Sequence, residues 1–239
     1  MLSSYNSPVA VGPTSPKLAA SSAAATVTTT SVMANGVNDV AASHGTNGSS
    51  AHSRCSSCHH IWLVTGPAGC GKSTVAEHLA NSLNLPYVEG DEFHPKANID
   101  KMSNGIPLTD ADRWDWLTAL REESMRRISD GDGRNEVVLT CSALKRKYRD
   151  VIRVAPYFNT GVSLHFIYLS ADPQVLLARV AGRKGHYMGA NMVQSQLDIL
   201  EPPQADETDV ICFDVDRPLD EVKADVLQRV QSIINEDKA

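Results

Sequence analysis

The sequence predicts an α/β fold in which helices flank a central five-stranded parallel sheet. Five apolar, strand-like runs follow one another from residue 60 onward, separated by segments of helix length: HIWLVT, PYVEG, EVVLTCSA, LHFIYLSAD and DVICFDVD. The first run leads into a glycine-rich stretch, GPAGCGKST, and then into the helical pattern VAEHLANSL. Strands that alternate with helices are typical of mostly parallel sheets, in which the connecting helices cover both faces.

A complete phosphate-binding motif follows the first predicted strand. Gly66, Gly71, Lys72 and Ser73 satisfy GxxxxGK[ST] in the strand–loop–helix setting that this P-loop motif requires. Glycines let several backbone N–H groups turn toward one anion, and the next helix presents its positive end. We expect Lys72 to reach the β and γ phosphates and the Ser73 hydroxyl to ligate Mg²⁺. The predicted nucleotide-binding residues are Gly66, Pro67, Ala68, Gly69, Cys70, Gly71, Lys72, Ser73 and Thr74.

The segments after this loop have helical signatures. Apolar residues recur on one stripe between Gly71 and Leu83, so the loop is expected to open directly into a helix. Thr109 and Asp112 have the spacing of a capping box and predict the start of a second helix. The apolar side of that helix is predicted to contain Trp114, Leu117, Met125 and Ile128.

The expected nucleotide is ATP. A GTP-binding protein would need the guanine-reading motif NKxD, which the sequence lacks. The DGDG string at residues 130–133 spells DxxG, but it follows a polar helix end and is interpreted as a surface turn.

The second predicted strand brings two acids toward the phosphate site. Ligands of open α/β sheets bind outside the carboxyl ends of the strands. Glu89 and Asp91 follow the short run at Tyr87 and are expected to project toward the phosphates from alternate positions. Two solvated loop acids are the alternative interpretation.

Composition argues against two classes of partner. A net charge of −6 and a pI near 5.7 provide no basic surface for wrapping nucleic acid. No run approaches the roughly 20 apolar residues that cross a bilayer, so neither nucleic acid nor a membrane is expected as a partner. The cysteines are odd in number, and Cys70, Cys141 and Cys212 lie in a loop and in apolar runs. Free thiols in a reducing, cytoplasmic compartment are therefore expected.

Residues 1–57 differ from the rest of the chain. They consist largely of Ser, Ala, Thr, Asn and Gly, which predicts a disordered low-complexity tail before a domain at 58–239. A mitochondrial transit peptide is the alternative, although Lys17 and Arg54 are the tail's only basic residues. The string CSSCHH at 55–60 matches a haem-attachment pattern and loosely suggests a zinc knuckle. Neither is expected, because no second ligand pair is positioned for zinc and haem attachment would need an export signal.

Four further strings carry a family resemblance. They are GDEFHPKANIDKMSNGIPLTDADRWDWL, CSALKRKYRDVIR, RKGHYM and EPPQADETDV, in this order along the chain. Together they closely resemble the gluconokinase family of small P-loop sugar-acid kinases, from Ile61 to about Leu219. The resemblance implies the nucleoside-monophosphate-kinase fold with a mobile lid. It also implies transfer of the γ phosphate of ATP to the 6-hydroxyl of D-gluconate, giving 6-phosphogluconate and ADP.

The resemblance implies roles for residues on the acceptor side. Asp91 of GDxxHP would orient the acceptor hydroxyl and stand where it can take the proton. His94, Arg113 and Lys145 would contact the acceptor. Arg113 begins its predicted helix and is suited to pair with the gluconate carboxylate, with a salt bridge to a neighbouring Asp as the alternative. Lys145 and Arg149 are four residues apart on one predicted helix face, which we expect to look into the cleft.

Two features of the sequence affect the expected Mg²⁺ site. Glu89 stands where the family more often has an aspartate, so direct ligation and contact through water are both open. The run VVLTCSALK ends without the carboxylate of a Walker B motif. Metal ligation is therefore expected mainly from Ser73, the nucleotide and water.

The segment VLLARVAGRKGHYMGANM has the look of a helix that runs into a lid. Arg179 and Arg183 are four residues apart, and we expect them to close over the nucleotide as negative charge shifts in the transition state. Arg183 joins Lys72 and Asp91 as a predicted catalytic residue. An ordinary basic helix end is the alternative.

Two other functions remain as alternatives. One is a kinase of the same architecture that acts on shikimate or a nucleotide, although such relatives lack GDxxHP together with CSALK. The other is a nucleotide-binding switch without turnover, against which the intact Lys72 and Asp91 argue. Dimers are common in the family that the sequence resembles, so a homodimer is possible, but no residue of the sequence identifies an interface.

Overall fold

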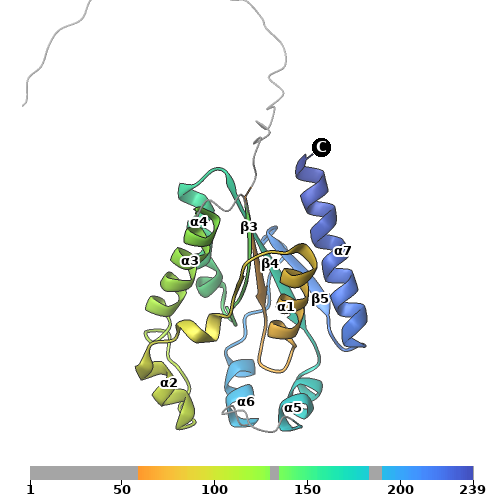
Figure 1. Cartoon of the computed structure of the whole chain (residues 1–239). Helices are drawn as coiled ribbons and strands as arrows, with labels where there is room; N and C mark the ends of the chain where they lie inside the picture. The colour runs from red at the N-terminus through yellow and green to blue at the C-terminus, as the bar shows by residue number, and fades with distance from the viewer. Residues whose placement is uncertain (1–58, 130–134, 183–189, 239) are drawn as a thin grey trace, which may run out of the picture. The chain divides into compact units, whose positions relative to one another are not determined.

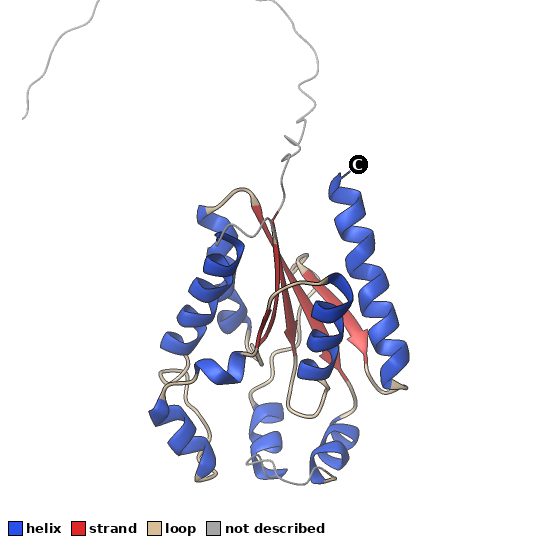
Figure 2. Ribbon diagram, viewed as in Figure 1, coloured by secondary structure: helices blue, strands red, loops and turns tan. Residues whose placement is uncertain are grey.

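The computed structural model describes residues 59–129, 135–182 and 190–238, where strands and helices alternate as predicted (Figures 1 and 2). The predicted tail lies outside these residues. The elements are β1 (His59–Thr65), α1 (Lys72–Leu83), β2 (Tyr87–Val88), the 3₁₀ helix η1 (Gly90–Phe93), α2 (Lys96–Ser103), α3 (Trp114–Ser129), β3 (Glu136–Thr140), α4 (Arg146–Phe158), β4 (Val162–Ser170), α5 (Pro173–Ala181), α6 (Ala190–Asp198), β5 (Val210–Asp214) and α7 (Leu219–Lys238).

The five strands form one parallel sheet in the order β2-β3-β1-β4-β5, which confirms the predicted fold class. The central strand is β1, where Leu63 is paired with Leu139 of β3 on one side and with Phe166 of β4 on the other. In Figure 2 the strand arrows end on the side where α2, α5 and α6 lie. The loop after β1 therefore starts in the middle of the edge where such sheets bind ligands.

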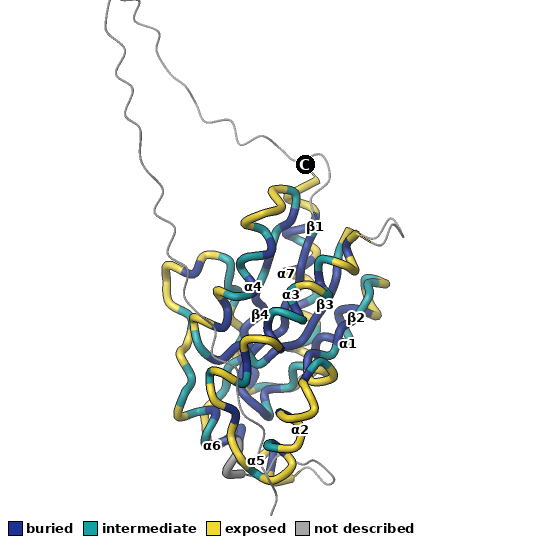
Figure 3. Tube along the Cα trace, turned by 90° about the vertical axis from the view of Figure 1, so that its left-hand side faces the viewer, coloured by how far each residue is buried: buried dark blue, intermediate teal, exposed yellow. Residues whose placement is uncertain are grey.

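Two hydrophobic clusters cover the two faces of the sheet. Ile61 and Leu63 belong to one cluster and Trp62 and Val64 to the other, because successive side chains of a strand point to opposite faces. Helices α3 and α4 cover the first face, and α1 and α7 cover the second (Figure 1). Figure 3 shows β1, β3 and β4 largely buried in the interior and α2 largely exposed.

Helix α3 differs in one respect from the prediction. Asp112 Oδ2 accepts hydrogen bonds from the backbone N–H (2.9 Å) and the hydroxyl (2.8 Å) of Thr109, but a turn follows before the helix begins at Trp114. Trp114 is 37% exposed, whereas Trp116 is 1% exposed. The predicted apolar side therefore differs from the buried side at Trp114, because the buried stripe follows Trp116, Leu117, Leu120, Ser124 and Ile128.

The described residues contain Cys70, Cys141 and Cys212, all of which are free thiols. The first two are buried, and burial raises the pKa of Cys141 to about 12, so this thiol stays protonated at neutral pH. Within the same described residues, no helix has both the length and the apolar character that a membrane span needs.

Two histidines and a tryptophan stack on β1 and β4. The ring centroids of Trp62 and His165 are 4.4 Å apart, and those of Trp62 and His60 are 5.2 Å apart. His60 Nδ1 and His165 Nε2 lie 3.2 Å from each other, so one of the two nitrogens must be unprotonated. Burial, together with His60, lowers the pKa of His165 to about 4. Burial also lowers the pKa of His60, although Glu136 and Asp237 oppose the shift.

Stability is expected to fall as the pH decreases from about 6.5 toward 4. The unfolded chain binds a proton on His165 near the ordinary pKa of 6.5, while the folded protein binds it only near 4. The unfolded state is therefore favoured progressively within that window. The variant His165→Phe keeps an aromatic ring against Trp62 and should flatten the decrease in Tm between about pH 6.5 and 5. Melting curves of both proteins across this range test it, and equal slopes would contradict the assignment.

Candidate active site

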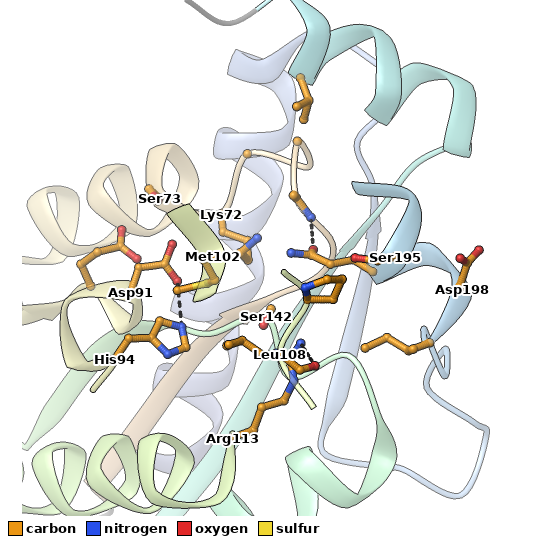
Figure 4. A pocket seen from close by; sticks show the side chains of 18 residues that line it. Lys72, Ser73, Asp91, His94, Met102, Leu108, Arg113, Ser142, Ser195 and Asp198 are labelled. Atoms are coloured by element: carbon orange, nitrogen blue, oxygen red, sulfur yellow. Dashed lines mark hydrogen bonds and ion pairs between the residues drawn. The ribbon is translucent and has the colours of Figure 1, made fainter. Parts of the chain in front are cut away.

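A cavity of about 330 Å³ lies where the loop after β1 meets α1. Figure 4 shows Lys72 and Ser73 entering it from the loop and α1, with Asp91 and His94 beside them and Ser195 and Asp198 on the opposite side. The predicted site residues that line it are Ala68, Gly69, Gly71, Lys72, Ser73, Glu89, Asp91, His94 and Arg113. Gly66, Pro67, Cys70 and Thr74 of the predicted loop do not line the cavity.

The loop leaves the first turn of α1 open to an anion. Gly71 is the N-cap with φ of 94°, a left-handed conformation that favours glycine, and no side chain caps the helix. The first N–H groups of a helix have no intrahelical partner, so they are available to phosphate oxygens. Lys72 extends back along the loop, where its Nζ donates a hydrogen bond to the carbonyl oxygen of Pro67 at 3.1 Å.

Hydroxyl groups hold the carboxylate of Glu89 at the end of β2. One carboxylate oxygen accepts from the Tyr87 hydroxyl at 2.5 Å, and the other accepts from the Thr140 hydroxyl. Burial opposes ionisation, but hydrogen bonds from Thr140, Tyr87 and Ser73 lower the pKa of Glu89 overall. Glu89 therefore presents a negative charge next to the Ser73 hydroxyl at neutral pH.

This donor set fits a magnesium ion held between protein and nucleotide. The hydroxyl of Ser73 and the carboxylate of Glu89 are the oxygen ligands that Mg²⁺ prefers. Both Glu89 oxygens already accept a hydrogen bond, and each keeps a second lone pair for a metal-bound water. Among the described residues, no cluster of three or more His, Cys, Asp or Glu side chains is arranged to hold a metal by itself. Phosphate oxygens would have to complete the coordination.

A glycine explains how Asp91 is brought next to the phosphate loop. A Cβ on Gly90 would lie 2.0 Å from the carbonyl oxygen of Thr140, so another residue could not approach β3 this closely. The Gly90 N–H donates to the Thr140 hydroxyl at 3.0 Å, and the Gly90 carbonyl accepts from Trp116 Nε1 at 2.7 Å. These bonds fix the start of η1, which carries Asp91.

His94 lies beside Asp91 on the same side of the cavity, with Nε2 4.0 Å from Asp91 Oδ1 (Figure 4). The ring stacks on Trp116, with centroids 4.0 Å apart, and its Nδ1 lies 3.4 Å from the amide nitrogen of Asn98. Because an amide nitrogen donates, the proton of the neutral ring belongs on Nε2, toward Asp91. Burial and, less strongly, Arg113 lower the pKa of His94 to about 4, so the ring is neutral at pH 7.

Arg113 brings a buried positive charge to the acceptor side. It is 7% exposed, and its Nη2 lies 3.4 Å from the carbonyl oxygen of Leu108. Its Nε is buried and has no hydrogen-bond partner in the described part of the chain. The alternative of a salt bridge with a neighbouring Asp is not seen at Asp112, which binds Lys101 at 2.6 Å instead. The guanidinium therefore has donor capacity for an anionic ligand.

Lys145 and Arg149 do not share a face that lines the cavity. Lys145 is the N-cap of α4, and its ammonium binds Asp110 at 3.0 Å. Arg149 is 1% exposed, and its Nε and Nη2 bind the two carboxylate oxygens of Glu207 at 2.7 Å each. The prediction that Arg149 faces the cleft is wrong, because the buried carboxylate of Glu207 holds its guanidinium in the interior. Neither Lys145 nor Arg149 lines the cavity.

Of the two predicted lid arginines, only Arg179 belongs to the residues that the structure describes. Arg179 donates from Nη2 to the carbonyl of Val215 at 2.7 Å and does not line the cavity. Arg183 lies outside the described residues, as does the rest of 183–189 within the segment that was expected to run into a lid.

Sequence reasoning missed the part of the cavity wall formed by residues of α2, α5, α6 and the loops. This wall includes the polar residues Ser142, Ser195, Gln196 and Asp198 and the apolar residues Met102, Pro107, Leu108, Val180 and Ile199. Met102, Pro107, Leu108, Ser142 and Val180 lie within the quoted strings, but no role was assigned to them. The four residues at 195–199 belong to no quoted string and approach the P-loop only through the fold.

Comparisons with known proteins agree with this geometry. Residues 61–203 match a family model described as an AAA domain. A probable gluconokinase of Schizosaccharomyces pombe is 46% identical over 179 residues, which cover 75% of this chain and 92% of that protein. This chain belongs to the gluconokinase family. The thermoresistant gluconokinase of Escherichia coli is 40% identical, over 72% of this chain and 94% of its own length.

Solved structures place this gluconokinase-family chain among P-loop kinases. A gluconokinase from Sinorhizobium meliloti 1021 is 39% identical with a TM-score of 0.61, over 78% of this chain and 99% of that one. An unliganded sugar kinase from Janibacter sp. HTCC2649 is 37% identical with a TM-score of 0.62, over 74% of this chain and 95% of that one. The APS kinase of Mycobacterium tuberculosis shares the fold. It is 20% identical with a TM-score of 0.52, over 73% of this chain and 98% of that one.

Proposed function

We propose that this protein is an ATP-dependent gluconate kinase, which transfers the γ phosphate of ATP to the 6-hydroxyl of D-gluconate and releases 6-phospho-D-gluconate and ADP. The observation that carries the proposal is one cavity in which the phosphate loop faces Asp91, neutral His94 and buried Arg113. The match to gluconokinases over more than 90% of their own lengths supports the choice of gluconate.

The phosphate side of the cavity binds and orients the nucleotide. The open N–H groups at the start of α1 and the Lys72 ammonium would hold the phosphates. Ser73 would ligate Mg²⁺ directly, and Glu89 would contact the ion through water. When bound, the ion neutralises charge on the β and γ phosphates.

The acceptor side orients the sugar acid. The Asp91 carboxylate would accept a hydrogen bond from the 6-hydroxyl and take its proton as the phosphoryl group is transferred. The Nε2–H of His94 points toward Asp91 and would keep it in place without neutralising its charge. Arg113 would pair with the gluconate carboxylate, which matches the unused donor capacity of its guanidinium.

Three further roles belong to the proposal. Lys145 would contact the acceptor only after its ammonium leaves Asp110. Arg179 and Arg183 would bring positive charge to the nucleotide as negative charge shifts in the transition state. We also propose that the enzyme works in the cytoplasm and as a homodimer.

An acceptor panel tests the proposed reaction. ADP release is measured with ATP, Mg²⁺ and, in turn, D-gluconate, other aldonates, shikimate and AMP. D-gluconate is expected to give the highest kcat/KM, and the product should have the mass of a phosphogluconate. Faster turnover of shikimate or AMP would instead support a kinase for another acceptor. ATP binding without turnover of any acceptor would support the non-catalytic alternative.

A further inference from the structure

One peptide of the phosphate loop is held at both of its hydrogen-bonding groups. The carbonyl of Pro67 accepts from the Lys72 ammonium at 3.1 Å, and the N–H of Ala68 donates to Oε1 of Gln196 at 2.8 Å. These two groups belong to the same peptide unit, which is planar, so its C=O and N–H turn together. A contact that fixes the N–H therefore also fixes the carbonyl that binds Lys72.

The partner of the Ala68 N–H belongs to a helix that is far away in the sequence but packs on the loop. Gln196 lies on α6, is 8% exposed and lines the cavity. On the same helix, Val193 is fully buried in a small cluster with Ala68 and Val180. This hydrogen bond is buried. If Gln196 were replaced by a residue without an acceptor, the Ala68 N–H would lose its partner and water could not fully replace it.

We propose that Gln196 is a positioning residue for the phosphate-binding lysine. By holding the Ala68 N–H, it orients the Pro67–Ala68 peptide so that the carbonyl of Pro67 holds the Lys72 ammonium at the cavity before the nucleotide arrives. An ammonium group has three donors, so one bond to Pro67 leaves two N–H groups for phosphate oxygens. Ordering a flexible lysine in advance removes part of the entropic cost of binding. The inference rests on the proposed function in one respect, namely that Lys72 binds nucleotide phosphates.

A double-mutant cycle on ATP affinity tests this proposal. The Kd for ATP is measured by calorimetry for the parent protein, Gln196→Leu, Lys72→Ala and the double variant. Gln196→Leu has a similar volume and no acceptor, and it should weaken ATP binding about fivefold when Lys72 is present. The same substitution should change Kd by less than about twofold when Lys72 is replaced, because its effect passes through the lysine. Equal weakening in both backgrounds would overturn the proposal.

Two further variants keep the test interpretable. Gln194→Leu alters an exposed glutamine of the same helix, whose amide binds Asp198 at 2.8 Å, and should leave the Kd for ATP unchanged. Gln196→Ser leaves room for water to accept from the Ala68 N–H, and it replaces Gln196→Leu in the cycle if that variant does not fold. The same dependence on Lys72 is expected, and its absence would again overturn the proposal.

The outcome can be separated from a failure of the proposed function, because the cycle measures binding and needs no acceptor. ATP binding that shows the Lys72-dependent effect, without ADP formation from gluconate, would refute gluconate kinase activity and support the role of Gln196. Normal gluconate turnover with equal weakening in both backgrounds would refute the role of Gln196 alone.

Discussion

Asp91→Asn is expected to lower kcat for gluconate phosphorylation by about 10²–10⁴, while the Kd for ATP changes little. An amide has nearly the size of the carboxylate, but it cannot take the proton of the acceptor hydroxyl. The position of Asp91 on η1 is fixed by the bonds of Gly90 to Thr140 and Trp116, so the geometry of the site should survive the change.

Steady-state kinetics and ATP calorimetry on the same protein measure the two effects separately. Glu92→Gln is the matched control, because Glu92 is the exposed next residue on η1 and does not line the cavity. Its kcat should remain near that of the parent protein. A collapse of ATP binding in Asp91→Asn would assign Asp91 to the metal site instead.

Glu207→Gln is expected to lower the free energy of unfolding by about 3–5 kcal/mol. The carboxylate is fully buried and receives the guanidinium of Arg149 through two bonds of 2.7 Å, a bond of 2.7 Å from Arg153 and one of 3.0 Å from the Gln204 N–H. Hydrogen bonds from Arg149 and Arg153 outweigh burial and lower the pKa of Glu207 to about 2. Removing the negative charge leaves Arg149 buried without its counter-charge.

Denaturant unfolding of the variant tests this expectation. Asp206→Asn is the control, since the adjacent Asp206 pairs with Arg146 on the surface, where water screens the attraction, and its loss should change the free energy of unfolding little. Replacing the buried pair together, as Arg149→Met with Glu207→Leu, should recover much of the loss because no isolated charge remains. A decrease no larger than that of the control would contradict the burial argument.

The parts of the site that could be predicted from sequence are those whose partners are close along the chain. The GxxxxGK[ST] string requires a defined loop and helix, and Lys72 and Ser73 line the cavity as expected. Glu89 and Asp91 follow a strand whose carboxyl end reaches the ligand edge of the sheet, and both line the cavity as well.

The parts that could not be predicted depend on partners far along the chain. Arg149 was placed by helical spacing, but its position is decided by Glu207, 58 residues later. Gln196 carries no local signal, and the Ala68 N–H that it binds is 128 residues away. The sequence does not show which of Trp114 and Trp116 is buried, because both are tryptophans near the start of the same helix. Trp116 is the one whose indole N–H bonds to the Gly90 carbonyl, 26 residues away, and this contact exists only in the tertiary structure.

The central position of β1 has a consequence for how the chain folds. Trp62 of β1 bonds to Glu136 at the start of β3, 74 residues later, and His60 contacts His165 of β4, 105 residues later. During synthesis β1 therefore leaves the ribosome long before either neighbouring strand exists. Ile61, Trp62, Leu63 and Val64 of β1 are apolar on both faces of the strand. Both edges of β1 also lack their hydrogen-bonding partners until β3 and β4 have been made. Contacts this distant also require large loops to close first, which places folding of this domain at the slow end for its size. The strand that anchors the phosphate loop is thus also exposed to aggregation while the chain is incomplete.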